Sequence, residues 1–149
     1  MQIGDICTHR VVTIDKTASI FDAAKLMRAE HVGDLVVVDS DAAQSRPLGI
    51  VTDRDLVVEL LAKNVELDSV VVGDVASART VTARADSELL DTLKLMSVKG
   101  VRRVPVVDDD GNLVGILSAN DVLGVAQDML ARLRDLDSRR VARERSTRE

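Results

Sequence analysis

One short string of residues occurs twice in the chain and combines groups that could bind a ligand. Residues 49–55 (GIVTDRD) and 115–121 (GILSAND) share a glycine, two apolar residues, a hydroxyl, two variable residues and an aspartate. The hydroxyls are Thr52 and Ser118, and the aspartates are Asp55 and Asp121. At the start of a helix, free backbone N–H groups and the positive end of the helix dipole favour phosphate. Because the aspartate follows about one turn later on the same face, its carboxylate could accept both hydrogen bonds of a ribose diol.

The same string also has a purely structural interpretation. A Thr or Ser followed three residues later by Asp is a helix-capping arrangement, in which both side chains bind backbone N–H groups. For a single copy of the string both interpretations stay open. Its recurrence at two places in the chain favours ligand binding.

The remaining composition gives little support to catalysis or to metal binding. Cys7 is the single cysteine, which excludes an internal disulfide and every Cys-pair zinc motif, and His9 and His31 cannot by themselves furnish a typical metal site. No nucleophile and base form a recognisable constellation. The chain has no Trp, no Tyr and one Phe, so the stacking of exposed bases on aromatic rings is excluded. We therefore expect no enzyme, no catalytic residue and no metal site.

The duplicated string is part of a longer internal repeat. Residues 3–6 (IGDI) recur as residues 72–75 (VGDV), a displacement of 72 − 3 = 69. After a longer loop in the first copy, the displacement falls to 115 − 49 = 66. A unit of about 60 residues is marginal alone, so we expect the two copies to bury their sheets against each other.

Each copy is predicted to contain a strand, a helix, two strands and a second helix. Short β-branched runs indicate the strands, and apolar residues at i, i+3, i+4 and i+7 indicate the helices. The predicted elements are 10–14, 19–30, 35–38, 48–51 and 52–63 in the first copy, and 79–82, 88–99, 104–107, 113–117 and a helix from 118 in the second. The pattern predicts an α+β fold in which two repeats pack with approximate two-fold symmetry.

Several motifs that recur in order resemble the signature of tandem CBS domains, named after cystathionine beta-synthase. They are the two strings, the valine-rich strands at 36–39 and 105–108 that precede them, and a helix ending in Leu-Met in each copy. The resemblance covers about residues 1–126 and implies repeats at 1–66 and 67–126, followed by a charged helix or tail at 127–149. Such pairs form disc-like modules that bind adenosine-containing ligands in clefts between the repeats, and they act as regulatory sensors without catalysis.

By this resemblance, each cleft takes a hydroxyl and an aspartate from one copy and strand entrances from the other. The first cleft would combine Thr52 and Asp55 with Arg79, Val101, Arg102 and Arg103. The second would combine Ser118 and Asp121 with Arg10, Val32, Gly33 and Asp34. Arginine binds phosphate through charge-assisted hydrogen bonds, whereas a carboxylate repels it. We therefore expect the cleft with the two arginines to be the stronger phosphate site; the alternative is a solvated turn that carries surface charge.

The resemblance predicts a non-catalytic regulatory module that senses AMP, ADP or ATP, with NAD or S-adenosylmethionine as further candidates, and that requires no cofactor. The alternative is a CBS pair that binds no ligand and regulates a partner through interaction or dimerisation. The Gly33-Asp34 sequence favours this alternative, whereas the four intact hydroxyl and carboxylate positions disfavour it. The effector protein is unknown. A homodimer is expected through helical faces that include Leu26, Met27, Leu95 and Met96, and the two methionines are expected to fill either the core or such an interface.

Charge and hydropathy restrict the other partners. The chain carries 20 Lys and Arg against 25 Asp and Glu, a net charge of −5, which argues against nucleic acid. No apolar stretch approaches the roughly 18 residues that span a bilayer, and the start lacks a signal-peptide pattern, so we expect no membrane partner and a cytoplasmic location. In 127–149, apolar residues at helical spacing predict a dimer contact in the first part and a frayed remainder.

Overall fold

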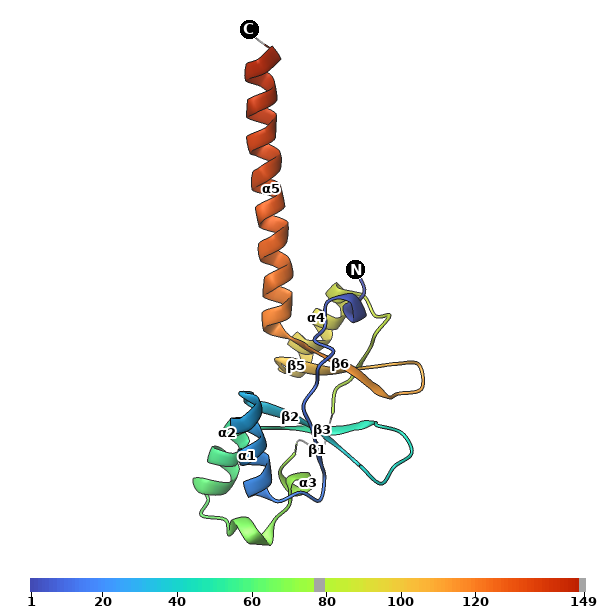
Figure 1. Cartoon of the computed structure of the whole chain (residues 1–149), viewed down its shortest axis with the longest axis vertical. Coiled ribbons are helices and arrows are strands. Elements are labelled where there is room, and N and C mark those ends of the chain that lie inside the picture. Colours follow the sequence, from blue (N-terminus) through green and yellow to red (C-terminus); the bar gives the residue numbers. More distant parts are fainter. Residues whose placement is uncertain (77–79, 148–149) are drawn as a thin grey trace. The chain divides into compact units, whose positions relative to one another are not determined.

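The computed structural model describes residues 1–76 and 80–147 (Figure 1). The chain divides into two compact units, Met1–Leu117 and Ser118–Glu149. The first unit holds two three-stranded sheets and the helices around them, which confirms the predicted α+β class.

The two sheets have the same order. The first consists of β1 (Thr13–Asp15), β2 (Asp34–Val38) and β3 (Pro47–Thr52). The second consists of β4 (Ala83–Arg84), β5 (Arg103–Val107) and β6 (Leu113–Ser118). In each sheet the middle strand pairs in parallel with the first strand, and in the first sheet β3 pairs with it antiparallel. The first strand of each copy begins later than predicted, because its pairing with the middle strand starts only at Thr13 and at Ala83.

Helices follow the strands much as the apolar spacing predicts. They are α1 (Ile20–Glu30), α2 (Asp53–Asp55) continued by the wider turns of η2 (Leu56–Leu61), α3 (Val72–Val75) and α4 (Leu89–Lys99), with short 3₁₀ turns at η1 (Ile3–Asp5) and η3 (Leu67–Ser69). The Ser19 hydroxyl caps α1 by accepting a hydrogen bond from the Asp22 N–H. Both long helices end in a left-handed residue, His31 (φ 55°) after α1 and Gly100 (φ 65°) after α4.

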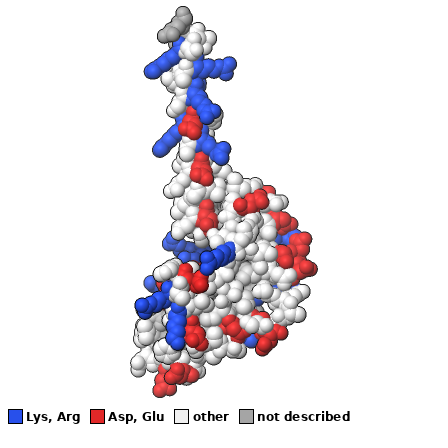
Figure 2. Space-filling model, viewed as in Figure 1, with Lys and Arg blue, Asp and Glu red and all other residues white. Residues whose placement is uncertain are grey.

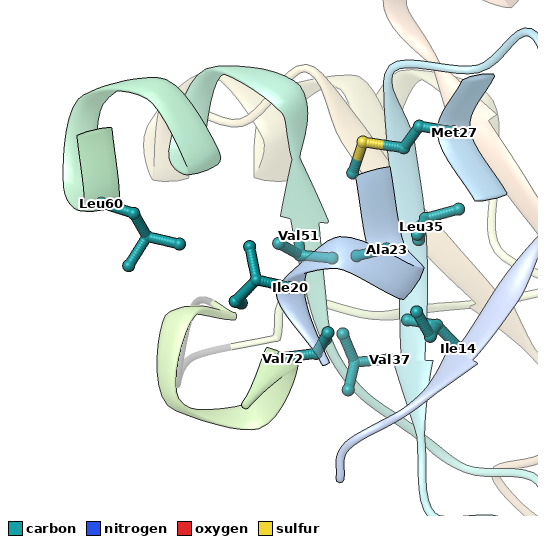
Figure 3. Packing of buried hydrophobic residues seen from close by; sticks show 9 residues of the cluster. All are labelled: Ile14, Ile20, Ala23, Met27, Leu35, Val37, Val51, Leu60 and Val72. Atoms are coloured by element: carbon teal, nitrogen blue, oxygen red, sulfur yellow. The ribbon is translucent and has the colours of Figure 1, made fainter. Parts of the chain in front are cut away.

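One cluster of apolar side chains forms the core of the first repeat (Figure 3). Its members come from the sheet, from the helices that cover it and from α3, and they are Ile14, Ile20, Ala23, Met27, Leu35, Val37, Val51, Leu60 and Val72. Val72 is fully buried, although its sequence motif opens the second copy. The core of the first repeat is therefore completed by a residue from the start of the second.

The opening segment of each copy forms hydrogen bonds with the other copy, and the two sets of bonds are equivalent. The Gly4 N–H donates to the carbonyl of Ala85 at 2.9 Å, and the Gly73 N–H donates to that of Lys16 at 2.8 Å. Both pairs are related by the displacement of 69, since 73 − 4 = 69 and 85 − 16 = 69. Reciprocal contacts of this kind are the mark of two-fold symmetry. They explain the repeated glycine, because a Cβ at either position would lie 2.9 Å from the facing carbonyl oxygen.

The methionines expected at a dimer surface lie inside the chain. Met27 is 6% exposed and Met96 is 3% exposed, which confirms that they fill the core and removes them from the expected dimer face. The large apolar side chains that remain open on α1 and α4 are Phe21, Leu90, Leu93 and Val98.

The second unit is one helix, α5 (Ala119–Thr147). The expected fraying of its second half is not observed up to residue 147, where much of the segment is Arg, Ala and Glu, which favour helix. No helix among the described residues has an apolar stretch long enough to cross a bilayer.

Candidate functional site

Thr52 and Asp55 form a reciprocal cap at the junction of β3 and α2. The Thr52 hydroxyl accepts a hydrogen bond from the Asp55 N–H at 3.1 Å, and Asp55 Oδ2 accepts one from the Thr52 N–H at 2.9 Å. The capping interpretation of the string is therefore correct for this copy. Within the described part of the chain, the second carboxylate oxygen of Asp55 accepts no hydrogen bond. The cap thus holds the carboxylate in place and leaves Oδ1 available to an external donor.

Ser118 and Asp121 repeat this arrangement at the start of the second unit. Asp121 Oδ2 accepts hydrogen bonds from the Ser118 N–H at 2.7 Å and from the Ser118 hydroxyl at 2.6 Å. The Asp121 N–H donates to the Ser118 hydroxyl at 3.3 Å. Both copies of the string therefore form a reciprocal cap, and the second adds a hydrogen bond from the hydroxyl to the carboxylate.

The start of β2 lies beside the first cap. Asp34 is paired with Thr52 in the sheet, and the Asp53 N–H donates to the carbonyl of Gly33 at 2.9 Å. A Cβ at Gly33 would lie 3.0 Å from Asp53 Oδ2, so the glycine lets this carboxylate pack closely. Asp53 is therefore also part of the site. In the sequence, only its position directly after Thr52 in the repeated string indicates this.

An ion pair connects the two repeats at this point. Arg103 Nε lies 2.9 Å from Asp34 Oδ1, and the two side chains are 41% and 17% exposed. Each residue opens the middle strand of its sheet. The displacement of 69 relates them, since 103 − 34 = 69. Equivalent positions of the two copies therefore meet with opposite charges, which sequence reasoning missed by placing them in different clefts.

The electrostatic surroundings of Asp34 disfavour its charge. Burial raises the pKa of the Asp34 carboxyl above its ordinary value, Arg103 lowers it, and the carboxylate of Asp53 raises it further. The ion pair offsets only part of the cost of burying this carboxylate next to another one.

The other predicted site residues have simpler surroundings. Val32 and Val101 are half-buried and equivalent, and their N–H groups donate to the carbonyls of Met27 and Met96, each at 3.0 Å. Arg10 is exposed and pairs with Glu30 at 2.9 Å.

The two other arginines predicted for the first cleft are Arg102 and Arg79. Arg102 is exposed, and its side chain has no recorded partner among residues 1–76 and 80–147. Arg79 lies outside the described residues. The structure thus brings Thr52, Asp55, Gly33, Asp34 and Arg103 into one neighbourhood, and it leaves Arg10 with a separate partner.

Metal ligation has no visible basis at this site. Over the described ranges, no three His, Cys, Asp or Glu side chains are grouped closely enough to hold an ion. The groups available are a carboxylate oxygen, backbone N–H groups and guanidinium groups, which suit a polar organic ligand carrying hydroxyls and an anionic group.

Comparisons with known proteins agree with this description. The family model described as CBS domain matches residues 3–62 and 72–128. An uncharacterized protein of Methanopyrus kandleri is 33% identical over 135 residues, which cover 91% of this chain and 67% of that protein. The structure of CBSX2 in complex with AMP matches with a TM-score of 0.71 and 30% identity, covering 86% of this chain and 97% of that one.

A second solved structure carries other adenosine compounds. The CBS domain pair of protein MJ0100, in complex with 5′-methylthioadenosine and S-adenosyl-L-methionine, matches with a TM-score of 0.74 and 26% identity. The alignment covers 87% of this chain and 98% of that one.

Proposed function

The chain belongs to the CBS domain family, and on that premise we propose that it is a non-catalytic regulatory module that binds an adenosine-containing nucleotide between its repeats. Two structural relatives bind adenosine compounds, AMP in one case and 5′-methylthioadenosine with S-adenosyl-L-methionine in the other. The observation that carries the proposal is the Thr52–Asp55 cap, which presents one unengaged carboxylate oxygen near an arginine from the other repeat.

The chemistry of these residues assigns a role to each part of the ligand. Asp55 accepts hydrogen bonds from the ribose hydroxyls, because a carboxylate is a strong acceptor and its free oxygen is held by the cap. Arg102 and Arg103, with Arg79, bind phosphate, and Val101 packs against the base. Ser118 and Asp121 offer the same hydroxyl and carboxylate for a second site in the second copy.

Regulation follows from competition for Arg103. A phosphate that binds this guanidinium replaces the carboxylate of Asp34, which opens the ion pair between the repeats. A ligand shifts a conformational equilibrium only through different affinities for the two states. The state with the pair open binds nucleotide more tightly, and an effector protein distinguishes the two states. AMP, ADP and ATP are the first candidates, followed by NAD and S-adenosylmethionine.

Purified protein provides the first test. Because the chain has no Trp and no Tyr, a bound purine dominates the near-ultraviolet absorption, and mass spectrometry of the molecules released on denaturation identifies it. A stoichiometric adenine compound supports the proposal. A blank spectrum together with no calorimetric binding of any of the five candidates contradicts it.

A pair of variants tests the role of the carboxylate. Asp55→Asn keeps an acceptor for the cap but removes the charge, so AMP affinity is expected to fall about tenfold or more. Asp74→Asn is the matched control, since Asp74 Oδ2 accepts from the Val71 N–H at the same 2.9 Å without a neighbouring hydroxyl. Equal losses in the two variants would assign Asp55 a structural role only.

A second candidate function is a pair that binds no ligand and acts by dimerisation. It is favoured by the internal partners that Thr52 and Arg103 already have, the Asp55 N–H and the Asp34 carboxylate. The open apolar side chains of α1 and α4 suit a homodimer formed through these helices; they are Phe21, Leu90, Leu93 and Val98. Light scattering of Leu90→Asp and Val98→Asp variants tests this surface, and an unchanged dimer mass excludes it.

A further inference from the structure

We propose that α5 pairs with α5 of a second copy as a parallel two-stranded coiled coil. This interaction surface is separate from nucleotide binding and rests on the second unit alone. The proposal is carried by an apolar seam along the helix and by the placement of opposite charges on its two flanks.

The seam has the spacing of a coiled coil. Its residues alternate at intervals of four and three, and they are Val122, Ala126, Met129, Leu133 and Leu136. Taking Ala126 and Leu133 as a positions makes Val122, Met129 and Leu136 d positions. The large side chains in the middle of the seam are open, with Met129 51%, Leu133 59% and Leu136 64% exposed. A soluble helix with such a stripe normally buries it against a partner.

The charged flanks specify which partner and which direction. With this assignment Arg132 and Arg139 occupy g positions, and Asp137 and Glu144 occupy e positions. In a parallel coiled coil a g residue faces the e residue five positions later on the other helix. The differences 137 − 132 = 5 and 144 − 139 = 5 place both g-position arginines opposite a carboxylate. An antiparallel pair would instead place arginine opposite arginine, because g then faces g.

These charged side chains form no ion pair within the described part of the chain. Figure 2 shows basic and acidic side chains distributed along α5. No ion pair recorded in residues 1–76 and 80–147 involves a residue of this helix. The four flanking groups therefore remain available to a second copy, which carries the complementary pattern by identity of sequence.

The seam also sets the length of the contact. Arg140 and Arg143 occupy the next a and d positions, so the apolar contact ends after Leu136. About two heptads are marginal for an isolated coiled coil, so assembly is expected to depend on protein concentration and on salt.

Disulfide trapping in the full-length protein tests the direction of pairing. Leu136→Cys places equivalent d residues opposite each other in a parallel pair, so mild oxidation is expected to give a covalent dimer. Ser138→Cys, on the outer f position of the same helix, is the control. The unmodified chain, whose Cys7 is buried, gives the background. Absence of the cross-link at 136, or equal cross-linking at 138, overturns the proposal.

Charge reversal tests the role of the flanks. Arg132→Glu with Arg139→Glu places acidic residues opposite acidic ones, so self-association measured by sedimentation equilibrium is expected to weaken at least about tenfold. Asp137→Arg with Glu144→Arg places basic residues opposite basic ones and is expected to weaken self-association to a similar extent. Mixing the two variant chains restores every attractive pair and is expected to give a heterodimer. A partner helix of another protein, or a dimer formed elsewhere on the chain, would leave self-association unchanged by these substitutions and would overturn the proposal.

Discussion

Asp34 and Arg103 show how one duplicated position came to carry two opposite charges. Both open the middle strand of a repeat, and they meet at 2.9 Å where the repeats face each other. Identical residues here would place like charges in contact, which is destabilising. The divergence of the two copies at this position therefore joins the repeats and makes the two halves of the site unequal.

The proposed competition between phosphate and Asp34 leads to a prediction for affinity. Arg103→Ala is expected to lower AMP affinity about tenfold or more, because a charge-assisted hydrogen bond to phosphate is lost. Asp34→Asn is expected to raise it, because the variant releases Arg103 and removes a like charge. Titration calorimetry of both variants and of the double variant measures the coupling. An Asp34→Asn variant that binds AMP more weakly would contradict the competition.

The raised pKa of Asp34 leads to a prediction for stability. Because the folded-state pKa lies above the unfolded value, ionisation of this carboxyl costs the folded state free energy once the pH exceeds both values. At about pH 7, Asp34→Asn is therefore expected to be at least as stable as the natural chain. Its advantage should shrink as the pH falls through the raised pKa and vanish below the ordinary one. Urea unfolding at several pH values measures this; an advantage that grows in acid would refute the assignment.

At the scale of elements, the ends of α1 and α4 differ in one residue. Both helices stop at a left-handed position, occupied by His31 in the first repeat and by Gly100 in the second. Glycine adopts this conformation without a steric penalty, whereas other residues adopt it at a cost in conformational free energy. The same tertiary turn is therefore reached at different conformational cost in the two copies.

Exchanging the residue types at these ends is expected to change stability in opposite directions. His31→Gly should raise the free energy of unfolding by about 1 kcal/mol, and Gly100→Ala should lower it by about the same amount. A Cβ at Gly100 has no atom within 4 Å, so its effect reports backbone strain and no clash. Thermal unfolding measures both, with shifts of about 3 °C. Shifts of the same sign would show that the conformation of the turn is not what decides them.

At the scale of the whole molecule, the opening segments make the first unit one cooperative structure. Val72 completes the core of the first repeat, and Ile3 is fully buried in a segment that bonds to residues of the second repeat. Neither repeat can lose its packing without exposing a segment that belongs to the other. The unit is therefore expected to unfold in a single transition.

Val72→Ala tests this cooperation. The substitution leaves a cavity in the first core and should lower the free energy of unfolding by about 2 kcal/mol. The unfolding of both repeats should shift together, as followed by hydrogen exchange of β2 and of β5. Protection lost in β2 alone would show that the repeats unfold independently.

Much of the fold and part of the site could be predicted from residue order alone. The displacement of 69 identified the repeat, and the hydroxyl and aspartate spacing identified both caps, because capping is a local interaction within one turn. The strand starts at 13 and 83 could not be placed, since they depend on pairing with a distant strand. The choice between core and interface for Met27 and Met96 stayed open, because an amphipathic pattern does not say which apolar residues reach the core.

By itself, the sequence determined the two copies, their α+β pattern, their caps and the residue types available to a ligand. Only the tertiary structure decided that the opening segment of each repeat bonds to the other repeat. It also decided that Asp34 forms an ion pair with Arg103. The physical reason is range. Caps, turns and helix faces follow from neighbours a few residues apart. Contacts across 69 residues depend on how the burial of apolar side chains brings distant segments together.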